Sequence, residues 1–287
     1  MTHGLTLVEC PRDAMQGIKT FIPTAVKIEY LKTLLQQGFD VLDCGSFVNP
    51  ESIPQMADTA EVIQAISEVE TTTKLLVIVA NERGALRAVA YPKIKYLGFP
   101  FSVSETFQRR NTNASRDEAF RRLARIQDIA SASGKEVVAY LSMAFGNPYG
   151  DVWSAMEVAE WASKIASLGI RTISLADTTG TANKEELGVL FEAIQDRLPY
   201  VEIGVHLHAS PADSLKKVQA AYEHGCRRFD GALGGFGGCP MAKDELVGNI
   251  PSELAFPWLI QQENRIWSNP IDWLALTARA VATYESK

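Results

Sequence analysis

The sequence has 287 residues, of which 46% are hydrophobic and 22% are charged, and its formal net charge is -6 at pH 7. This composition excludes intrinsic disorder, and the acidic balance argues against nonspecific binding to nucleic acid. The first residues form no secretion signal, and no apolar run reaches the roughly 18 residues that a membrane-spanning helix needs. We therefore expect a soluble cytoplasmic protein with neither a nucleic-acid nor a membrane partner.

Short runs of β-branched and apolar residues alternate along the chain with segments of helical periodicity. The runs predict eight strands, at residues 5–10, 40–47, 74–80, 93–99, 136–143, 172–177, 201–208 and 227–233. Several of them are apolar nearly throughout, which is typical of parallel strands that are covered on both faces.

Helices are predicted between the strands, each introduced by a residue suited to a helix start. These residues are Thr24, Asp58, Ser115, Asp151, Asn183 and Asp213. Glycines stand where the C-termini of helices need a left-handed residue, at Gly38, Gly134, Gly169 and Gly225. After the eighth strand, two further helices are predicted at 252–262 and 270–286.

Eight strands with intervening helices predict a (β/α)8 TIM barrel with extra C-terminal helices. No glycine-rich GxGxxG motif follows the first strand, so the usual dinucleotide-binding fold is not indicated. We expect one catalytic domain over residues 1–287, because no segment has the composition of a linker.

The most informative motif is the pair His206 and His208, near the end of the seventh predicted strand. Residues two apart in a strand point to the same face, so both imidazoles converge while Leu207 points the opposite way. A pair of hydrogen-bonded core histidines is one explanation. We favour a metal site, because neutral imidazole is a common metal ligand.

Further polar residues follow the first predicted strand, at the face where barrel enzymes carry their active sites. Asp13 is either a loop acid or helix cap, or a metal ligand beside the histidines. Arg12 is either an ion-pair partner of Asp13, or a fixed cation that stabilises an oxyanion or enolate. Gln16 lies within the same segment and is a candidate substrate contact.

Two carboxylates end other predicted strands. Asp43 lies in the closing segment DCGS of the second predicted strand, and Asp177 is the last residue of the sixth. They either pair with Arg12 or cap helices, or supply the carboxylates that acid–base catalysis needs.

The segment after the eighth strand is rich in glycine, with six glycines between residues 231 and 248. It is either a surface connection or a lid that closes over substrate. Cys239 lies within this segment, where a thiol could deliver or remove a proton, and Asn249 follows it.

Asp13, His206, His208 and Asn249 together form a mixed oxygen and nitrogen ligand set. Such a set suits Mg²⁺ or Mn²⁺, with positions left open for water or substrate. The residue types alone do not choose between these ions and Co²⁺ or Zn²⁺.

Six motifs of the chain resemble those of the 3-hydroxy-3-methylglutaryl-CoA lyase family. They are CPRDAMQG (10–17), DCGSFVNPESIPQMAD (43–58), SETFQRRNTNAS (104–115), ISLADTTG (173–180), HLH (206–208) and GGFGGCP (234–240). They follow in the family's order and spacing. The first motif and the histidine pair are shared with wider metal-dependent lyase and synthase barrels, whereas the second and the last are typical of the lyases.

The resemblance implies that a divalent metal is bound by Asp13, His206, His208 and Asn249. It also implies a role for each of the other site residues: Arg12 stabilises the enolate, Cys239 is the catalytic loop cysteine, Asp177 takes part in acid–base work, and Ser46 and Ser174 contact substrate.

The chain departs from the family pattern at four of these motif positions. Asp43 stands where glutamate is usual, Cys10 and Ala14 replace glycines beside the PRD triplet, and Ala209 replaces an aspartate after the histidine pair. The last change removes a potential partner of the imidazoles.

We expect a metal-dependent lyase that cleaves 3-hydroxy-3-methylglutaryl-CoA to acetoacetate and acetyl-CoA, as in leucine degradation. Metal coordination would lower the pKa of the substrate hydroxyl, with His206 or Asp177 as the base. The acyl-CoA substrate would meet a cationic rim at Arg109 and Arg110, unless these are merely solvated charges. The family implies a homodimer.

Three other functions remain open. The first is a Claisen synthase of the isopropylmalate or homocitrate type, and the second is an aldolase of 4-hydroxy-2-oxo acids. The third is a barrel that binds a ligand without catalysis, which the departures at Asp43 and Ala209 favour.

Overall fold

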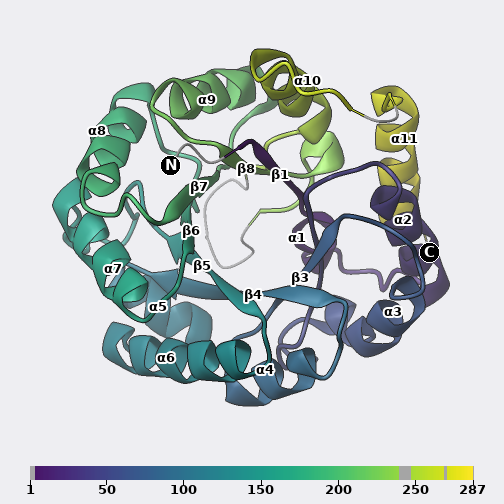
Figure 1. Ribbon diagram of the computed structural model, residues 1–287, viewed down its shortest axis with the longest axis horizontal. Coiled ribbons are helices and arrows are strands. Elements are labelled where there is room, and N and C mark those ends of the chain that lie inside the picture. The colour runs from purple at the N-terminus through teal and green to yellow at the C-terminus, as the bar shows by residue number, and fades with distance from the viewer. Residues whose placement is uncertain (1–3, 239–246, 268–269, 287) are drawn as a thin grey trace.

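The computed structural model, which describes residues 4–238, 247–267 and 270–286, is built around a closed barrel of eight parallel strands (Figure 1). Each strand pairs with the next along the chain, and β8 closes the ring against β1. The strands are β1 (Thr6–Glu9), β2 (Val41–Ser46), β3 (Lys74–Ile78), β4 (Ile94–Ser102), β5 (Glu136–Ser142), β6 (Thr172–Ala176), β7 (Glu202–His206) and β8 (Arg228–Gly231). The predicted TIM barrel is confirmed, and each strand overlaps its predicted range.

The short helix α1 (Pro11–Gln16) follows β1 directly and lies within the ring that the other helices form around the outside of the barrel (Figure 1). The other helices are α2 (Thr24–Leu35), α3 (Thr59–Ile66), α4 (Glu82–Val89), α5 (Glu105–Thr112), α6 (Arg116–Ala132), α7 (Ala155–Ser167), α8 (Lys184–Gln195), α9 (Pro211–Glu223), α10 (Ser252–Gln262) and α11 (Trp273–Tyr284). Two 3-10 turns, η1 (Pro54–Met56) and η2 (Leu233–Gly235), complete the described elements. The two predicted C-terminal helices are α10 and α11.

Several predicted helix ends are confirmed in atomic detail. Ser115 and Asn183 each form a capping box with the glutamate three residues later, at the starts of α6 and α8. The predicted C-terminal glycines all have positive φ angles: Gly38, Gly134, Gly169 and Gly225. Local sequence therefore determines these ends.

Three predicted helix starts are wrong. Thr24 is the first residue of α2 rather than its cap, since Pro23 occupies that position. Ser154 caps α7 in place of Asp151. The carboxylate of Asp151 instead accepts hydrogen bonds from the Ser104 hydroxyl and the Thr106 amide, at the start of α5. Asp213 lies in the first turn of α9, which begins at Pro211 because proline favours the first helical position.

The sequence patterns also missed α1, α4 and α5, which are at most eight residues long. Such helices offer few turns in which apolar periodicity can be recognised. For the site, α1 matters most: proline at its first position starts it directly after β1, and it packs against β2.

Apolar side chains fill two regions. A small set fills the inside of the barrel and includes Val8, Cys10, Leu76, Val138 and Tyr140. A much larger set packs between the strands and the outer helices. Because the barrel is filled by side chains, only the carboxyl ends of the strands are left to form a site.

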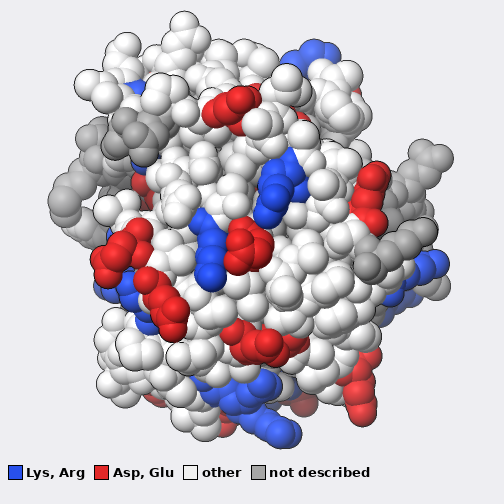
Figure 2. Space-filling model, turned by 90° about the vertical axis from the view of Figure 1, so that its right-hand side faces the viewer, with Lys and Arg blue, Asp and Glu red and all other residues white. Residues whose placement is uncertain are grey.

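On the face that Figure 2 shows, positive and negative side chains are interspersed, and no single sign dominates. Within the described residues, no helix combines the length and the apolarity needed to span a membrane.

Candidate active site

The two histidines converge at the end of β7, as predicted. Their ring centroids lie 5.1 Å apart, with the rings nearly perpendicular. Leu207 between them points into the core around the barrel. An antiparallel bridge between His208 and Asn249 holds the segment after β8 against this strand end.

Asp13 on α1 completes a compact group with the two histidines. One ligand atom from each of the three residues lies within 4.8 Å of the other two, and all three side chains are buried. The closest approach of the Asp13 carboxylate to His206 is 4.0 Å, between Oδ2 and Nε2. Residues nearly 200 positions apart in sequence therefore meet at one end of the barrel.

The protonation states of Asp13 and His208 suit a cation. Burial would raise the pKa of Asp13, but Arg12 and both imidazoles outweigh it and lower that pKa to about 2. Burial would lower the pKa of His206, yet Asp230 and Asp13 keep it above its ordinary value. The pKa of His208 is lowered by burial and by His206. Asp13 is thus an anion and His208 a neutral imidazole, as metal binding requires.

Arg12 lies beside this group and is held from two sides. Its Nε lies 3.1 and 3.0 Å from the two carboxylate oxygens of Asp43, and its Nη2 also donates to Asp43. Its Nη1 donates to Asp13 at 2.8 Å and to Gln16 at 2.9 Å. Burial raises the pKa of Asp43 to about 6, although Arg12 opposes this rise. Of the two interpretations of Asp43, the structure supports pairing with Arg12.

Asn249 reaches the same group. Its Nδ2 donates to Asp13 Oδ2 at 2.7 Å and to the carbonyl of Phe236 at 2.8 Å. The amide nitrogen therefore faces Asp13, whereas a metal would require the amide oxygen. Gly237 makes the approach possible, since a Cβ there would lie 2.5 Å from Asn249 Nδ2 and 2.9 Å from the carbonyl oxygen of Asp13.

Asp177 is occupied elsewhere. Its carboxylate accepts hydrogen bonds from the backbone amides of Thr181 and Ala182. It also forms an ion pair with Lys217, with Nζ 2.8 Å from Oδ2. These contacts fix the loop after β6. Asp177 is thus a loop-fixing partner of Lys217 rather than a helix cap, since Asn183 caps α8. A part in acid–base catalysis stays a prediction.

The two serines lie inside the barrel or at its end. The hydroxyl of Ser46 lies 3.4 Å from the carbonyl of Ile78. Ser174 is fully buried on β6, and its hydroxyl has no hydrogen-bond partner among the described residues. Cys239 lies outside the described residues, so its predicted role stays a prediction.

The two arginines of the predicted cationic rim both contact neighbouring side chains. Arg109 pairs with Glu105 at 2.8 Å on the surface of α5, and Arg110 stacks over the ring of Tyr149.

Two residues that the sequence analysis did not single out contact His206. Asp230 on β8 lies 3.1 Å from His206 Nδ1 and fixes the ring through Oδ2. The ring of Tyr140 lies edge-on to His206 at 5.8 Å between centroids. Asp230 lies in the middle of the predicted strand 227–233, so a search of predicted strand ends did not point to it.

The residues present fit a divalent metal ion. Neither ring nitrogen of His208 has a hydrogen-bond partner within the described part of the chain, although this side chain is only 4% exposed. Buried polar atoms without partners call for an explanation such as an ion. His206 keeps Nε2 toward Asp13 while Nδ1 is held by a carboxylate, the usual arrangement of a histidine that binds a metal.

A parallel (β/α)8 barrel with an aspartate and two histidines at the carboxyl ends of its strands belongs to the class of metal-binding barrel enzymes. The chain matches the HMGL-like family model over residues 7–279, and it belongs to that family.

Individual relatives agree with the family. The chain is 35% identical over 243 residues to the mitochondrial hydroxymethylglutaryl-CoA lyase of Mus musculus, covering 85% of this chain and 74% of the relative. It is 33% identical over 243 residues to the cytoplasmic 3-hydroxy-3-methylglutaryl-CoA lyase of Rattus norvegicus, covering 85% and 70%.

Among solved structures, an HMG-CoA lyase from Acinetobacter baumannii in complex with coenzyme A and 3-methylmalate superposes with a TM-score of 0.89 at 30% identity. The match covers 99% of this chain and 92% of that chain. The resemblance seen in the motifs is thus confirmed by sequence and by fold.

Proposed function

We propose that this protein is a carbon–carbon lyase that cleaves 3-hydroxy-3-methylglutaryl-CoA to acetoacetate and acetyl-CoA. The observation that carries the proposal is the buried group of Asp13, His206 and His208 with Arg12 directly beside it. The similarity to hydroxymethylglutaryl-CoA lyases over 85% of the chain supports the choice of substrate.

The proposed ligands of the metal are Asp13, His206, His208 and Asn249, and the proposed ion is Mg²⁺ or Mn²⁺. Two imidazoles, the Asp13 carboxylate and the amide oxygen of Asn249 leave positions open for substrate oxygens, provided that the Asn249 amide turns its oxygen to the ion on binding. When bound, the ion lowers the pKa of the substrate's tertiary hydroxyl and orients it.

Arg12 stabilises the negative charge that collects on the thioester oxygen when the carbon–carbon bond breaks. Its guanidinium is buried and fixed by Asp43 and Asp13, so its charge is in place before the reaction begins. Gln16 accepts a hydrogen bond from Arg12 Nη1 and donates one to Asp13 Oδ1. In our proposal Gln16 also contacts substrate.

Proton transfers are assigned to residues around this centre. The candidate bases for the substrate hydroxyl are His206 and Asp177, of which His206 lies in the group itself. Cys239 is proposed to protonate the carbon of the enolate to give acetyl-CoA. Ser46 and Ser174 are proposed substrate contacts.

The direct test is turnover of a small panel of acyl-CoA thioesters by the purified protein with added Mg²⁺ or Mn²⁺. We expect acetoacetate and acetyl-CoA from 3-hydroxy-3-methylglutaryl-CoA, and loss of this activity after a chelator. Release of free thiol from acetyl-CoA and a 2-oxo acid would instead identify a Claisen synthase. Absence of turnover with all of these substrates would favour the third alternative, a barrel that binds a ligand without catalysis.

The proposal extends to the location and assembly of the protein. We propose that the protein acts in the cytoplasm as a homodimer and serves leucine degradation. Its relatives include both cytoplasmic and mitochondrial lyases, so localisation of the tagged protein in cells is the check.

A further inference from the structure

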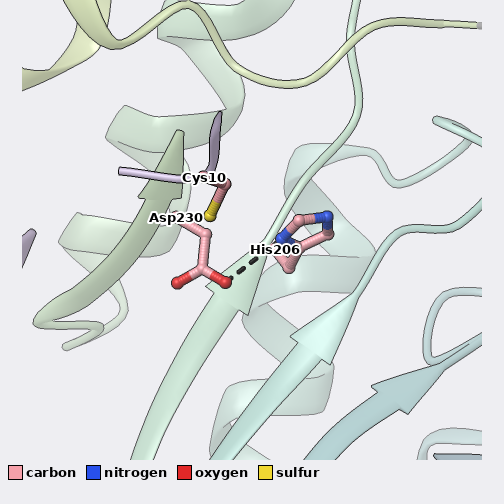
Figure 3. Close-up of side chains that lie close together, drawn as sticks. All are labelled: Cys10, His206 and Asp230. Carbon is pink, nitrogen blue, oxygen red and sulfur yellow. Dashed lines mark hydrogen bonds and ion pairs between the residues drawn. The ribbon is translucent and has the colours of Figure 1, made fainter. Parts of the chain in front are cut away.

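A second group of metal-ligand types lies next to the proposed centre. Cys10 at the end of β1, His206 on β7 and Asp230 on β8 each offer one ligand atom within 4.8 Å of the other two. Figure 3 shows the three side chains facing one another, with the hydrogen bond between Asp230 and His206. All three are buried.

These side chains retain capacity for another ligand. Asp230 is 4% exposed, and its Oδ1 has no hydrogen-bond partner among the described residues. In the part of the chain that the structure describes, the hydrogen bond of the Cys10 thiol is a long one, 3.8 Å to the carbonyl of Val8. Neither group is therefore fully used by the contacts that the structure shows.

We propose that Cys10, His206 and Asp230 form an inner site for a thiophilic divalent ion, of which Zn²⁺ and Cd²⁺ are examples. A thiolate, an imidazole and a carboxylate are the donors that Zn²⁺ takes in tetrahedral sites. The thiolate sets this group apart from the oxygen-rich set around Asp13, because soft sulfur selects zinc-like ions over Mg²⁺.

His206 belongs to both groups, and this makes the two ions competitors. In the structure Nδ1 faces Asp230, so a neutral ring donates its proton there and leaves Nε2 for the outer ion. An ion at the inner site takes Nδ1, the ring proton moves to Nε2, and the thiol proton is released to solvent. Inner binding therefore removes a ligand from the outer ion. This competition rests on the proposed function, whereas the inner site itself does not.

The test of the inner site uses Co²⁺, whose bond to a thiolate produces a charge-transfer absorption in the near ultraviolet. We would titrate the Cys239→Ser protein with Co²⁺, so that the loop thiol cannot contribute. We expect the absorption in this protein, its loss after a further Cys10→Ser, and its retention after a further Cys44→Ala. Cys44 is a matched control, since it is also buried but belongs to neither metal-ligand group.

Two outcomes would overturn the proposal: absence of the absorption in the Cys239→Ser protein, or an absorption that survives Cys10→Ser. Asp230→Asn in the same background provides a second check, with Co²⁺ affinity expected to fall at least about tenfold. Circular dichroism of each variant verifies that it is folded. None of these readouts needs lyase activity, so they stand even if the proposed substrate is wrong.

Competition is measured separately, with the wild-type chain. We expect Zn²⁺ at low concentration to slow turnover in Mg²⁺, and Cys10→Ser to relieve this inhibition. Equal inhibition of both proteins would place the inhibitory ion elsewhere.

Discussion

Arg12 contacts both a metal-ligand candidate and a second carboxylate, and its surroundings determine what its loss should do. Asp43 is held by Nε and Nη2 and Asp13 by Nη1, so the guanidinium has little freedom to turn. An arginine held in this way needs no reorganisation when charge develops beside it.

Replacing Arg12 by glutamine should lower kcat by about 100- to 1,000-fold or more, because a preorganised charge at the enolate oxygen is lost. Metal affinity should change little, since Asp13 keeps its hydrogen bond from Gln16. Steady-state kinetics and a metal titration measure both quantities. Arg125→Gln is the control, because this arginine is exposed and forms a surface ion pair with Glu82. An unchanged kcat in Arg12→Gln would refute the assigned role.

Asp230 should matter for the metal rather than for the substrate. Its carboxylate fixes which nitrogen of His206 faces Asp13. Asp230→Asn should therefore weaken Mg²⁺ or Mn²⁺ binding by about 10- to 100-fold. Isothermal titration calorimetry gives this value directly. The exposed Asp213→Asn serves for comparison, and equal affinities of the two variants would contradict the role of Asp230.

At this scale the sequence predicted the convergence of the proposed ligands better than it predicted their surroundings. The spacing of His206 and His208 predicted their convergence, because strand geometry fixes it. Asp230 escaped notice because its contact with His206 joins different strands, and spacing along one strand carries no information about that pairing. Ala209 stands where the resemblance led us to expect an aspartate beside the imidazoles, but the carboxylate that holds His206 comes from Asp230.

Among the secondary-structure elements, α5 shows where sequence patterns fail. Its eight residues were not predicted as a helix, although Ser104 caps it by accepting a hydrogen bond from Phe107 N at 3.1 Å. The same hydroxyl donates to Asp151, which comes from the loop before α7. A contact between distant segments thus supports a helix too short for a clear periodicity.

Removing that cap should cost stability. Ser104→Ala removes both the cap of α5 and a partner of the Asp151 carboxylate, so we expect a loss of about 1–2 kcal/mol in unfolding free energy. Urea unfolding measures it. Ser133→Ala, at an exposed C-terminal cap of α6, should have no comparable effect. A similar loss in both variants would argue against the cap.

The longer elements follow the sequence closely, since all eight strands and the two C-terminal helices lie where their patterns place them. Alternation of buried runs with helical periodicity is a strong signal when it is repeated around a barrel. The helix starts that failed, at Thr24, Asp151 and Asp213, failed because a neighbouring residue made the better first or capping residue.

For the whole molecule, a buried acid links the first strand of the barrel to the segments after the last strand. Glu9 on β1 is fully buried and accepts hydrogen bonds from Ser252 and from the amide of Leu233, joining the first strand to the segments after the last. Burial raises the pKa of Glu9 to about 8, although both hydrogen bonds oppose the rise.

This buried acid predicts a pH dependence of stability. The pKa of Glu9 is about 8 in the folded protein against an ordinary 4.5, so the folded state holds a proton that the unfolded chain has lost. The contribution of Glu9 to the unfolding free energy should be largest below that ordinary value and fall as the pH rises toward 8, by at most about 1.4 kcal/mol per pH unit.

Glu9→Gln should remove this component of the pH dependence and stabilise the protein at pH above 8 relative to the wild type. Chemical unfolding of both proteins at mildly acidic and at alkaline pH provides the comparison. Parallel pH profiles for the two proteins would show that Glu9 does not hold its proton.

The central claim concerns the whole barrel, since its proposed ion draws ligands from α1, the end of β7 and the segment after β8. Titration with Mn²⁺, followed by electron paramagnetic resonance, tests it most directly. We predict a single Mn²⁺ site per chain in the wild type, and affinity lowered at least about tenfold in Asp13→Asn and in His208→Ala. A wild-type chain that binds no Mn²⁺, or variants that bind it as tightly as the wild type, would contradict the account.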